Sequence, residues 1–260
     1  QIVVVNGGGE NNCLDILIKW KKVFKELIIV DTINKNLSHS RNIGLAKCTH
    51  SLILFTDDDA RPYPNWIENI IFYHQKYPKA GNIGGGVFDN QSITFLSKVA
   101  DIVTFPRYKK EKKVKTIPGV NSSFKRAAIL EVGEYDTLLF RGEDVDFNWR
   151  VLRKGWDIIY VPSIKVKHIH RTSWLKLFHQ HYMYGRAYYI LRRKWTTMYS
   201  IYPRKIKSYR DLIKYIASWT YTPFTDAVLK SKFFKIKNPL IILIIFFVNL
   251  CNRIGIFVQK

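Results

Sequence analysis

The chain has 260 residues, 47% of them apolar, which is enough for one large domain with a sizeable core, or one domain with an appendage. Its formal charge of +22 is concentrated near the C-terminus: residues 161–260 hold 19 Lys and Arg against 2 Asp and Glu, whereas residues 1–100 hold 11 against 9. This asymmetry predicts an anionic partner for the C-terminal part: lipid, nucleic acid or a phosphorylated substrate. The three cysteines are too scattered for a disulfide framework or a metal cluster, which favours a reducing, cytosolic setting.

Short apolar runs alternate with helical patterns in the first 60 residues. The runs at 2–5, 27–30 and 52–56 have the length and composition of buried strands. Strands of this kind alternating with helices predict an α/β fold with a mixed, mostly parallel sheet and helices on both faces. In such sheets ligands bind at the carboxyl ends of the strands. Asp31 and the Asp57–Asp59 run lie at such ends.

Three adjacent carboxylates follow the third apolar run, at Asp57, Asp58 and Asp59. Their mutual repulsion is relieved well by a hard divalent cation with oxygen ligands. In an extended chain the side chains of residues i and i+2 point to the same side, so Asp57 and Asp59 can reach one cation together. Taken alone, the run fits a solvated acidic turn equally well.

A second group of acids opens a helix, at Glu143, Asp144 and Asp146. Acids in the first turn of a helix stabilise it through the helix dipole by about 0.3–1 kcal/mol each. This structural role is enough to explain the presence of at least one of the three. Downstream, His168 and His170 lie at the exit of an apolar strand pattern. They are candidates either for metal ligation or for structural hydrogen bonding within the strand.

The C-terminal part predicts a helical extension that associates with a membrane. Residues 174–195 read as an aromatic, basic helix, and residues 240–258 are mostly apolar but contain two Asn, one Arg and one Gly. A helix in the membrane interface fits this composition better than a full span, although a single short span remains an alternative. We therefore expect a catalytic-type domain at 1–172 and a basic extension at 173–260, with residues 239–258 on the cytoplasmic face of an anionic membrane.

Four stretches, in their order and spacing, resemble the family 2 glycosyltransferases of the GT-A fold. They are Asn-Leu-Ser-His-Ser-Arg-Asn-Ile-Gly at 36–44, Phe-Thr-Asp-Asp-Asp-Ala at 55–60, Gly-Val-Asn-Ser-Ser-Phe at 119–124, and Gly-Glu-Asp-Val-Asp-Phe at 142–147 with Gly-Trp at 155–156. The resemblance covers about residues 1–195 and is to inverting, rhamnosyltransferase-like members.

The resemblance implies a hexosyltransferase that moves a sugar from a nucleotide diphosphate sugar to an acceptor hydroxyl with inversion, in cell-surface or lipid-linked glycan synthesis. Asp57 and Asp59 would bind Mg²⁺ or Mn²⁺, with His168 or His170 as a further ligand. Asp144 would be the general base and Glu143 would position the acceptor. The residues implied on the nucleotide-sugar side are Asp31, Arg41, Asp58 and Asn121.

The sequence departs from the family pattern at its start. The first strand and helix of the family have no counterpart, and Val5 stands where relatives often have an Asp. We expect a fragment of an active enzyme, with a degenerate, non-catalytic homologue and a metal-dependent nucleotidyltransferase as the alternatives. A nucleic-acid partner is not expected, because the cationic and aromatic residues gather beside an apolar C-terminus.

Overall fold

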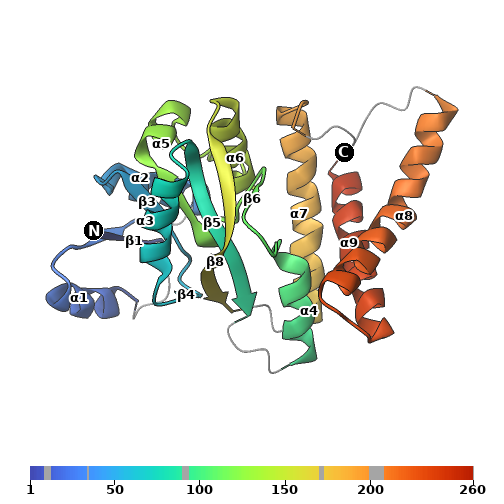
Figure 1. Ribbon diagram of the computed structural model, residues 1–260, viewed down its shortest axis with the longest axis horizontal. Helices are drawn as coiled ribbons and strands as arrows, with labels where there is room; N and C mark the ends of the chain where they lie inside the picture. The colour runs from blue at the N-terminus through green and yellow to red at the C-terminus, as the bar shows by residue number, and fades with distance from the viewer. Residues whose placement is uncertain (9–12, 34, 90–93, 170–172, 199–207, 260) are drawn as a thin grey trace. The chain divides into compact units, whose positions relative to one another are not determined.

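The computed structural model describes residues 1–8, 13–33, 35–89, 94–169, 173–198 and 208–259 (Figure 1). Its residue contacts divide the chain into two compact units, each made of three segments. Unit 1 comprises residues 1–57, 64–85 and 108–164, and unit 2 comprises residues 58–63, 86–107 and 165–260. The predicted division at 172 falls at the edge of residues 170–172, which lie outside the described part, and it stays a prediction.

Unit 1 begins with a two-stranded parallel sheet. Strand β1 (Ile2–Asn6) pairs with β2 (Leu27–Asp31), and helix α1 (Cys13–Val23) precedes β2. Helix α2 (Leu37–Lys47) follows and is capped by Asn36, whose side chain accepts a hydrogen bond from the backbone N–H of His39 at 2.9 Å. The first two predicted strands are therefore present, and the Asn36 cap fixes where α2 begins.

A second sheet has the strand order β3-β7-β5-β8-β4, with β6 pairing against β8. Its strands are β3 (Leu52–Phe55), β4 (Ala60–Pro62), β5 (Ala80–Asp89), β6 (Lys112–Lys113), β7 (Ser122–Lys125) and β8 (Asp157–His168). The pairings β3–β7, β4–β8, β5–β7 and β6–β8 are antiparallel. The α/β class with a mixed sheet is confirmed: β1 and β2 pair in parallel, whereas these four pairings are antiparallel.

Two segments differ from what their composition alone indicates. Pro162 and Ser163 read as a turn between two short strands, but β8 runs unbroken through both. The charged segment 107–115 reads as a loop, yet Lys112 and Lys113 pair with β8, opposite Tyr160 and Ile159. In both cases composition reports solvent exposure and turn tendency, whereas a neighbouring strand supplies hydrogen bonds that local sequence does not encode.

The core of unit 1 is aromatic at its centre. Phe147 is fully buried, stacks on Tyr135 with ring centroids 4.1 Å apart and meets Phe124 edge-on at 5.2 Å. Besides α1 and α2, this unit contains the α-helices α3 (Trp66–Lys76), α5 (Arg126–Val132) and α6 (Glu143–Arg153). Because Phe147 lies on α6, its burial fixes the start of that helix, where the predicted acidic residues lie.

Unit 2 is largely helical, with α4 (Phe95–Thr104), α7 (Trp174–Lys194), α8 (Tyr209–Phe233) and α9 (Pro239–Val258). Figure 1 shows α9 running between α7 and α8. Helices α7 and α9 approach closely at two glycines: a Cβ on Gly185 would lie 1.9 Å from the carbonyl oxygen of Asn252, and one on Gly255 would lie 2.0 Å from that of Tyr182. The basic helix and the apolar helix predicted from sequence are therefore both present, packed backbone to backbone.

Helix α9 is also the one described helix that is long and apolar enough to cross a membrane, judged by length and composition alone. It has 20 residues and a mean hydropathy of 2.3 over its most apolar window, of which 17% is buried. On those measures it is a weak indication of membrane association.

Candidate active site

The three consecutive aspartates form the turn between β3 and β4. Pairing of β4 with β8 sets Ala60 opposite His168, and the backbone N–H of Ile169 donates to the carbonyl oxygen of Asp59 at 3.1 Å. The carboxylate of Asp59 then lies 3.1 Å from Nε2 of His168. Strand pairing thus brings together two residues that are 109 positions apart in the chain.

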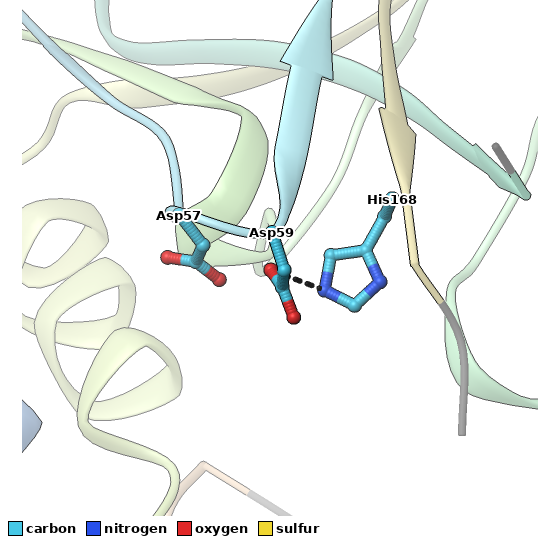
Figure 2. Close-up of side chains that lie close together, drawn as sticks. All are labelled: Asp57, Asp59 and His168. Atoms are coloured by element: carbon cyan, nitrogen blue, oxygen red, sulfur yellow. Dashed lines mark ion pairs between the residues drawn. The ribbon is translucent and has the colours of Figure 1, made fainter. Parts of the chain in front are cut away.

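Asp57, Asp59 and His168 each offer one ligand atom, and these atoms all lie within 4.8 Å of one another (Figure 2). The side chains of Asp57 and Asp59 are 34% and 43% exposed, and that of His168 is 16% exposed. Two carboxylates and one imidazole suit Mn²⁺, and the carboxylates suit Mg²⁺. The predicted i, i+2 pair and His168 therefore come together as a group that fits a divalent cation, whereas His170 lies outside the described residues.

Arg41, on α2, connects the aspartate turn with the acids that open α6. Its Nη1 donates to Oε1 of Glu143 at 2.8 Å, and its Nη2 lies 3.7 Å from Oδ1 of Asp57. The guanidinium is buried and lies over the rings of Tyr135 and Phe55, at 5.5 and 5.9 Å from their centroids. All these residues belong to unit 1, so they form one electrostatic network within it, centred on the buried Arg41.

The two acids at the start of α6 have different surroundings. Glu143 is buried, and burial together with the charge of Asp144 raises the pKa of its carboxyl group, while Arg41 opposes the rise. Asp144 is half-buried: its Oδ2 accepts a hydrogen bond from the backbone N–H of Gly119 at 3.1 Å and its Oδ1 accepts one from Val145 at 2.8 Å. Glu143 is therefore committed to a buried ion pair, whereas Asp144 is fixed in place and still partly accessible.

Gly119 opens a short 3₁₀ helix (Gly119–Asn121) against this network. A Cβ at this position would lie 2.3 Å from Nη2 of Arg41. The absence of a side chain therefore leaves room for the guanidinium, and the backbone N–H of the same residue holds Asp144.

Asn121 is fully buried and its amide group is engaged inside unit 1. Its Oδ1 accepts from Nε1 of Trp66 at 2.8 Å, and its Nδ2 donates to the carbonyl oxygen of Ile164 at 3.1 Å. A direct contact with a donor would require this side chain to leave both partners. Asp58, by contrast, is exposed in the turn.

Asp31 lies at a different place in unit 1, at the end of β2. Its Oδ1 accepts from Nδ2 of Asn6 at 2.8 Å. It lines an open hollow of about 640 Å³ together with Gly7, Gly8, Thr32 and Ile33. Its described contacts link Asp31 to this hollow and not to the network around Arg41.

Sequence reasoning missed two residues that shape the site. Tyr135 packs beneath Arg41, and Trp66 holds Asn121. Neither lies in a motif. The helical spacing of apolar residues around Trp66 indicates a core-facing position, but no signal in the sequence connects it with Asn121.

Residues 1–133 match the sequence model of glycosyl transferase family 2. The chain belongs to this family. Among curated relatives, this family 2 chain is 27% identical over 175 residues to a "Poly-beta-1,6-N-acetyl-D-glucosamine synthase" of Staphylococcus aureus (strain COL), covering 62% of the chain and 41% of that protein. It is 26% identical over 154 residues to a "Pre-mycofactocin glycosyltransferase" of Mycobacterium tuberculosis (strain CDC 1551 / Oshkosh), covering 54% of the chain and 31% of that protein. The chain therefore spans less than half the length of these relatives.

Solved structures confirm the GT-A fold. A mannosyltransferase from Pyrobaculum calidifontis, PcManGT, in complex with GDP-Man and Mn²⁺, matches with a TM-score of 0.64 at 13% identity, covering 100% of this chain and 77% of the other. GalNAc-T7, crystallised with UDP, GalNAc and Mn²⁺, matches with a TM-score of 0.53 at 15% identity, covering 73% and 44%. At these identities the likeness concerns the fold alone.

Proposed function

We propose that this chain transfers a hexose from a nucleotide diphosphate sugar to an acceptor hydroxyl, with inversion, in the synthesis of a cell-surface or lipid-linked glycan. The observation that carries the proposal is that the ligand atoms of Asp57, Asp59 and His168 lie close enough together to bind one divalent cation, in a family 2 chain. A polysaccharide synthase among the relatives, and nucleotide-sugar or nucleotide complexes among the similar structures, support the substrate classes.

In this proposal Asp57, Asp59 and His168 hold Mn²⁺ or Mg²⁺. Such a cation, when bound, supplies positive charge against the diphosphate of the donor as the nucleotide leaves. The carboxylates contribute the hard oxygen ligands, and His168 contributes a neutral imidazole whose Nε2 already faces Asp59. Asp58 lies exposed on the same turn, where it can face the donor.

Asp144 serves as the general base. Its carboxylate is held by the N–H groups of Gly119 and Val145 and is half-buried, so it can take the proton of the acceptor hydroxyl without reorienting. A positioned base contributes about 10²–10⁴-fold to the rate. One base acting on one hydroxyl in a single displacement gives inversion at the anomeric carbon.

Glu143 and Arg41 act as positioning residues. Glu143 is buried against Arg41, which reaches Asp57, so this pair sets the geometry around the acceptor and donor sides. Asn121 supports the Gly119 loop through Trp66, and Asp31 faces the hollow at the ends of β1 and β2, a suitable place for the base or ribose of the nucleotide.

The chain works at the cytoplasmic face of the cell membrane in this proposal. The support is the apolar helix α9 and the excess of cationic residues in the C-terminal hundred residues. Lys and Arg residues that precede an apolar helix closely in the chain are typical of an end that lies on the cytoplasmic side.

The test is a screen of nucleotide sugars with Mn²⁺, in which the released nucleotide is identified. Free nucleoside diphosphate is the expected product. Pyrophosphate would assign the site to a nucleotidyltransferase, and donor binding without turnover would assign it to a non-catalytic homologue.

The base assignment is tested separately. Asp144→Asn is expected to lose turnover by about 10²-fold or more while keeping donor and Mn²⁺ binding. Glu68→Gln, at an exposed position on α3, is the matched control. Wild-type turnover in Asp144→Asn would show that another group takes the proton.

A further inference from the structure

Helix α8 buries small residues and exposes large apolar ones, the reverse of a helix in a water-soluble protein. Among its described residues, the buried side chains are those of Ser218, Ala227 and Ser231, at 7%, 0% and 7% exposure, and that of Pro223. Its exposed apolar side chains are Tyr209, Leu212, Ile213, Ile216, Tyr221, Phe224, Leu229 and Phe233. Small residues at helix contacts with large apolar residues outside are typical of helices that pack within lipid. We propose that α8 and α9 together form a helical hairpin that docks on an anionic lipid bilayer, with α8 contributing an acyl-chain contact of its own.

Three hydroxyl groups of α8 donate their hydrogen bonds within the helix itself. The hydroxyl of Ser218 donates to the carbonyl oxygen of Tyr215 at 2.7 Å, and that of Ser231 donates to Val228 at 2.8 Å. Thr225 donates in the same way to Thr222 at 3.0 Å. Hydroxyls bonded to the preceding helical turn are compatible with an apolar surrounding.

Charge is almost absent from the middle of the hairpin. Asp226 is the sole charged residue between 215 and 229, and its Oδ2 accepts from Nδ2 of Asn249 on α9 at 2.9 Å and lies 3.1 Å from Nζ of Lys230. Helix α9 carries one charged residue, Arg253. The carboxylate of Asp226 is therefore paired with Lys230 and bonded to α9, although its side chain is 45% exposed, and this pairing lowers the cost of placing it near lipid.

Helix α9 presents a matching apolar stripe. Its exposed apolar side chains recur at helical spacing, at Leu240, Leu243, Phe247, Ile254, Phe257 and Val258. The two helices also touch near the far end of the hairpin, where the rings of Trp219 and Phe257 meet edge-on with centroids 5.6 Å apart. Both helices thus expose apolar side chains that can contact the acyl chains of one bilayer.

Basic residues mark both ends of α8. They are Arg210 and Lys214 near its start, and Lys230, Lys232, Lys235 and Lys237 at its end and in the connection to α9. Each such cation near an anionic bilayer contributes about 1 kcal/mol, or about fivefold in partitioning. A second copy of a chain with a charge of +22 would bring like charges together, so anionic lipid fits this surface better.

The experiment measures flotation of the full chain with vesicles of phosphatidylcholine, and of phosphatidylcholine mixed with phosphatidylglycerol. Ile216→Ser combined with Phe224→Ser is expected to lower partitioning about tenfold or more, because two large apolar contacts are lost. The matched control is Leu130→Ser with Leu138→Ser, two leucines of unit 1 that are even more exposed than Ile216 and Phe224. Both positions in each pair are exposed, so folding is preserved and is checked by circular dichroism.

Charge is tested in the same assay. Lys232→Glu with Lys237→Glu is expected to remove most of the preference for phosphatidylglycerol, at about fivefold or more per residue, whereas Lys22→Glu with Lys79→Glu leaves it unchanged. The assay uses no sugar donor, so its result is independent of whether the chain transfers sugar. The proposal is overturned if the wild type does not float, if the α8 variant floats like the wild type, or if that variant instead converts a lipid-free dimer into a monomer.

Discussion

The guanidinium of Arg41 lies between Glu143 and Asp57, 2.8 Å from the first carboxylate and 3.7 Å from the second. These residues come from α2, the start of α6 and the turn after β3, all within unit 1. Motifs that are about a hundred positions apart are thereby joined by one buried cation. An arginine suits this place because its planar fork can serve two acceptors at once.

Replacing Arg41 by lysine tests this relationship. Lysine keeps the charge but cannot donate along two fixed directions, so we expect kcat to fall by about tenfold to a hundredfold with little change in the KM for the donor. Steady-state kinetics with the donor found by the nucleotide-sugar screen provides the measurement, and Arg126→Lys, at an arginine outside this network, is the control. A rise in KM at constant kcat would instead make Arg41 a donor-binding residue.

Gly119→Ala should reproduce the effect of changing Arg41. The new Cβ would lie 2.3 Å from Nη2 of Arg41, so the guanidinium must move away from Glu143. We expect kcat to fall by about tenfold or more. In a double-mutant cycle, Gly119→Ala with Arg41→Lys is expected to be no worse than Arg41→Lys alone, because both changes disturb one contact. Additive losses would mean that Gly119 acts by another route.

His168→Ala is expected to weaken Mn²⁺ binding by about tenfold or more, because one of the three ligand atoms is removed. Isothermal titration calorimetry with Mn²⁺ alone measures this without any turnover. His50→Ala, at an exposed histidine in unit 1, provides the comparison. Unchanged affinity in His168→Ala would leave the aspartates as the sole ligands among these three.

The sequence predicts the elements of this site better than it predicts their partners. The strand before Asp57 and the helix that opens at Glu143 follow from periodicity and from acids in a first helical turn. That Arg41 points into the protein, and that Asn121 is fully used by Trp66 and Ile164, depends on contacts between distant segments. Such contacts leave no local pattern, because the sequence around an arginine or asparagine does not show whether its side chain faces a ligand or the core.

The partner of each strand could not be predicted for a similar reason. Alternation of short apolar runs with helices reports burial on both faces, and it does not name the neighbour of each strand. Leu52–Phe55 pairs with Ser122–Lys125, a polar segment with no strand-like apolar run, and the pairing is antiparallel. The burial of Ser122 and Ser123 in that strand is likewise invisible in composition.

The last prediction concerns pH and rests on His74 of α3. This side chain is buried, and its Nε2 lies 3.0 Å from Oγ of Ser123. Burial lowers the pKa of His74 to about 4; the hydrogen bond between Nε2 and the backbone carbonyl oxygen of Ser123, at 3.2 Å, opposes this shift, and the charge of Lys125 adds to it. In the unfolded chain a histidine takes up its proton near pH 6.5. Between these values the unfolded state binds more protons than the folded state, so stability must fall as the pH falls.

The expected size is about 2 kcal/mol in the free energy of unfolding between pH 7 and pH 5, within a total of about 3 kcal/mol by pH 4. Urea denaturation at both pH values measures it. His74→Gln has no titrating group at this position and should lack this part of the loss, whereas His50→Gln, at an exposed position, should behave like the wild type. If the wild type and His74→Gln lose the same stability between pH 7 and pH 5, the buried imidazole is already protonated in the fold, and the contact with Ser123 must then be a donation from a charged ring.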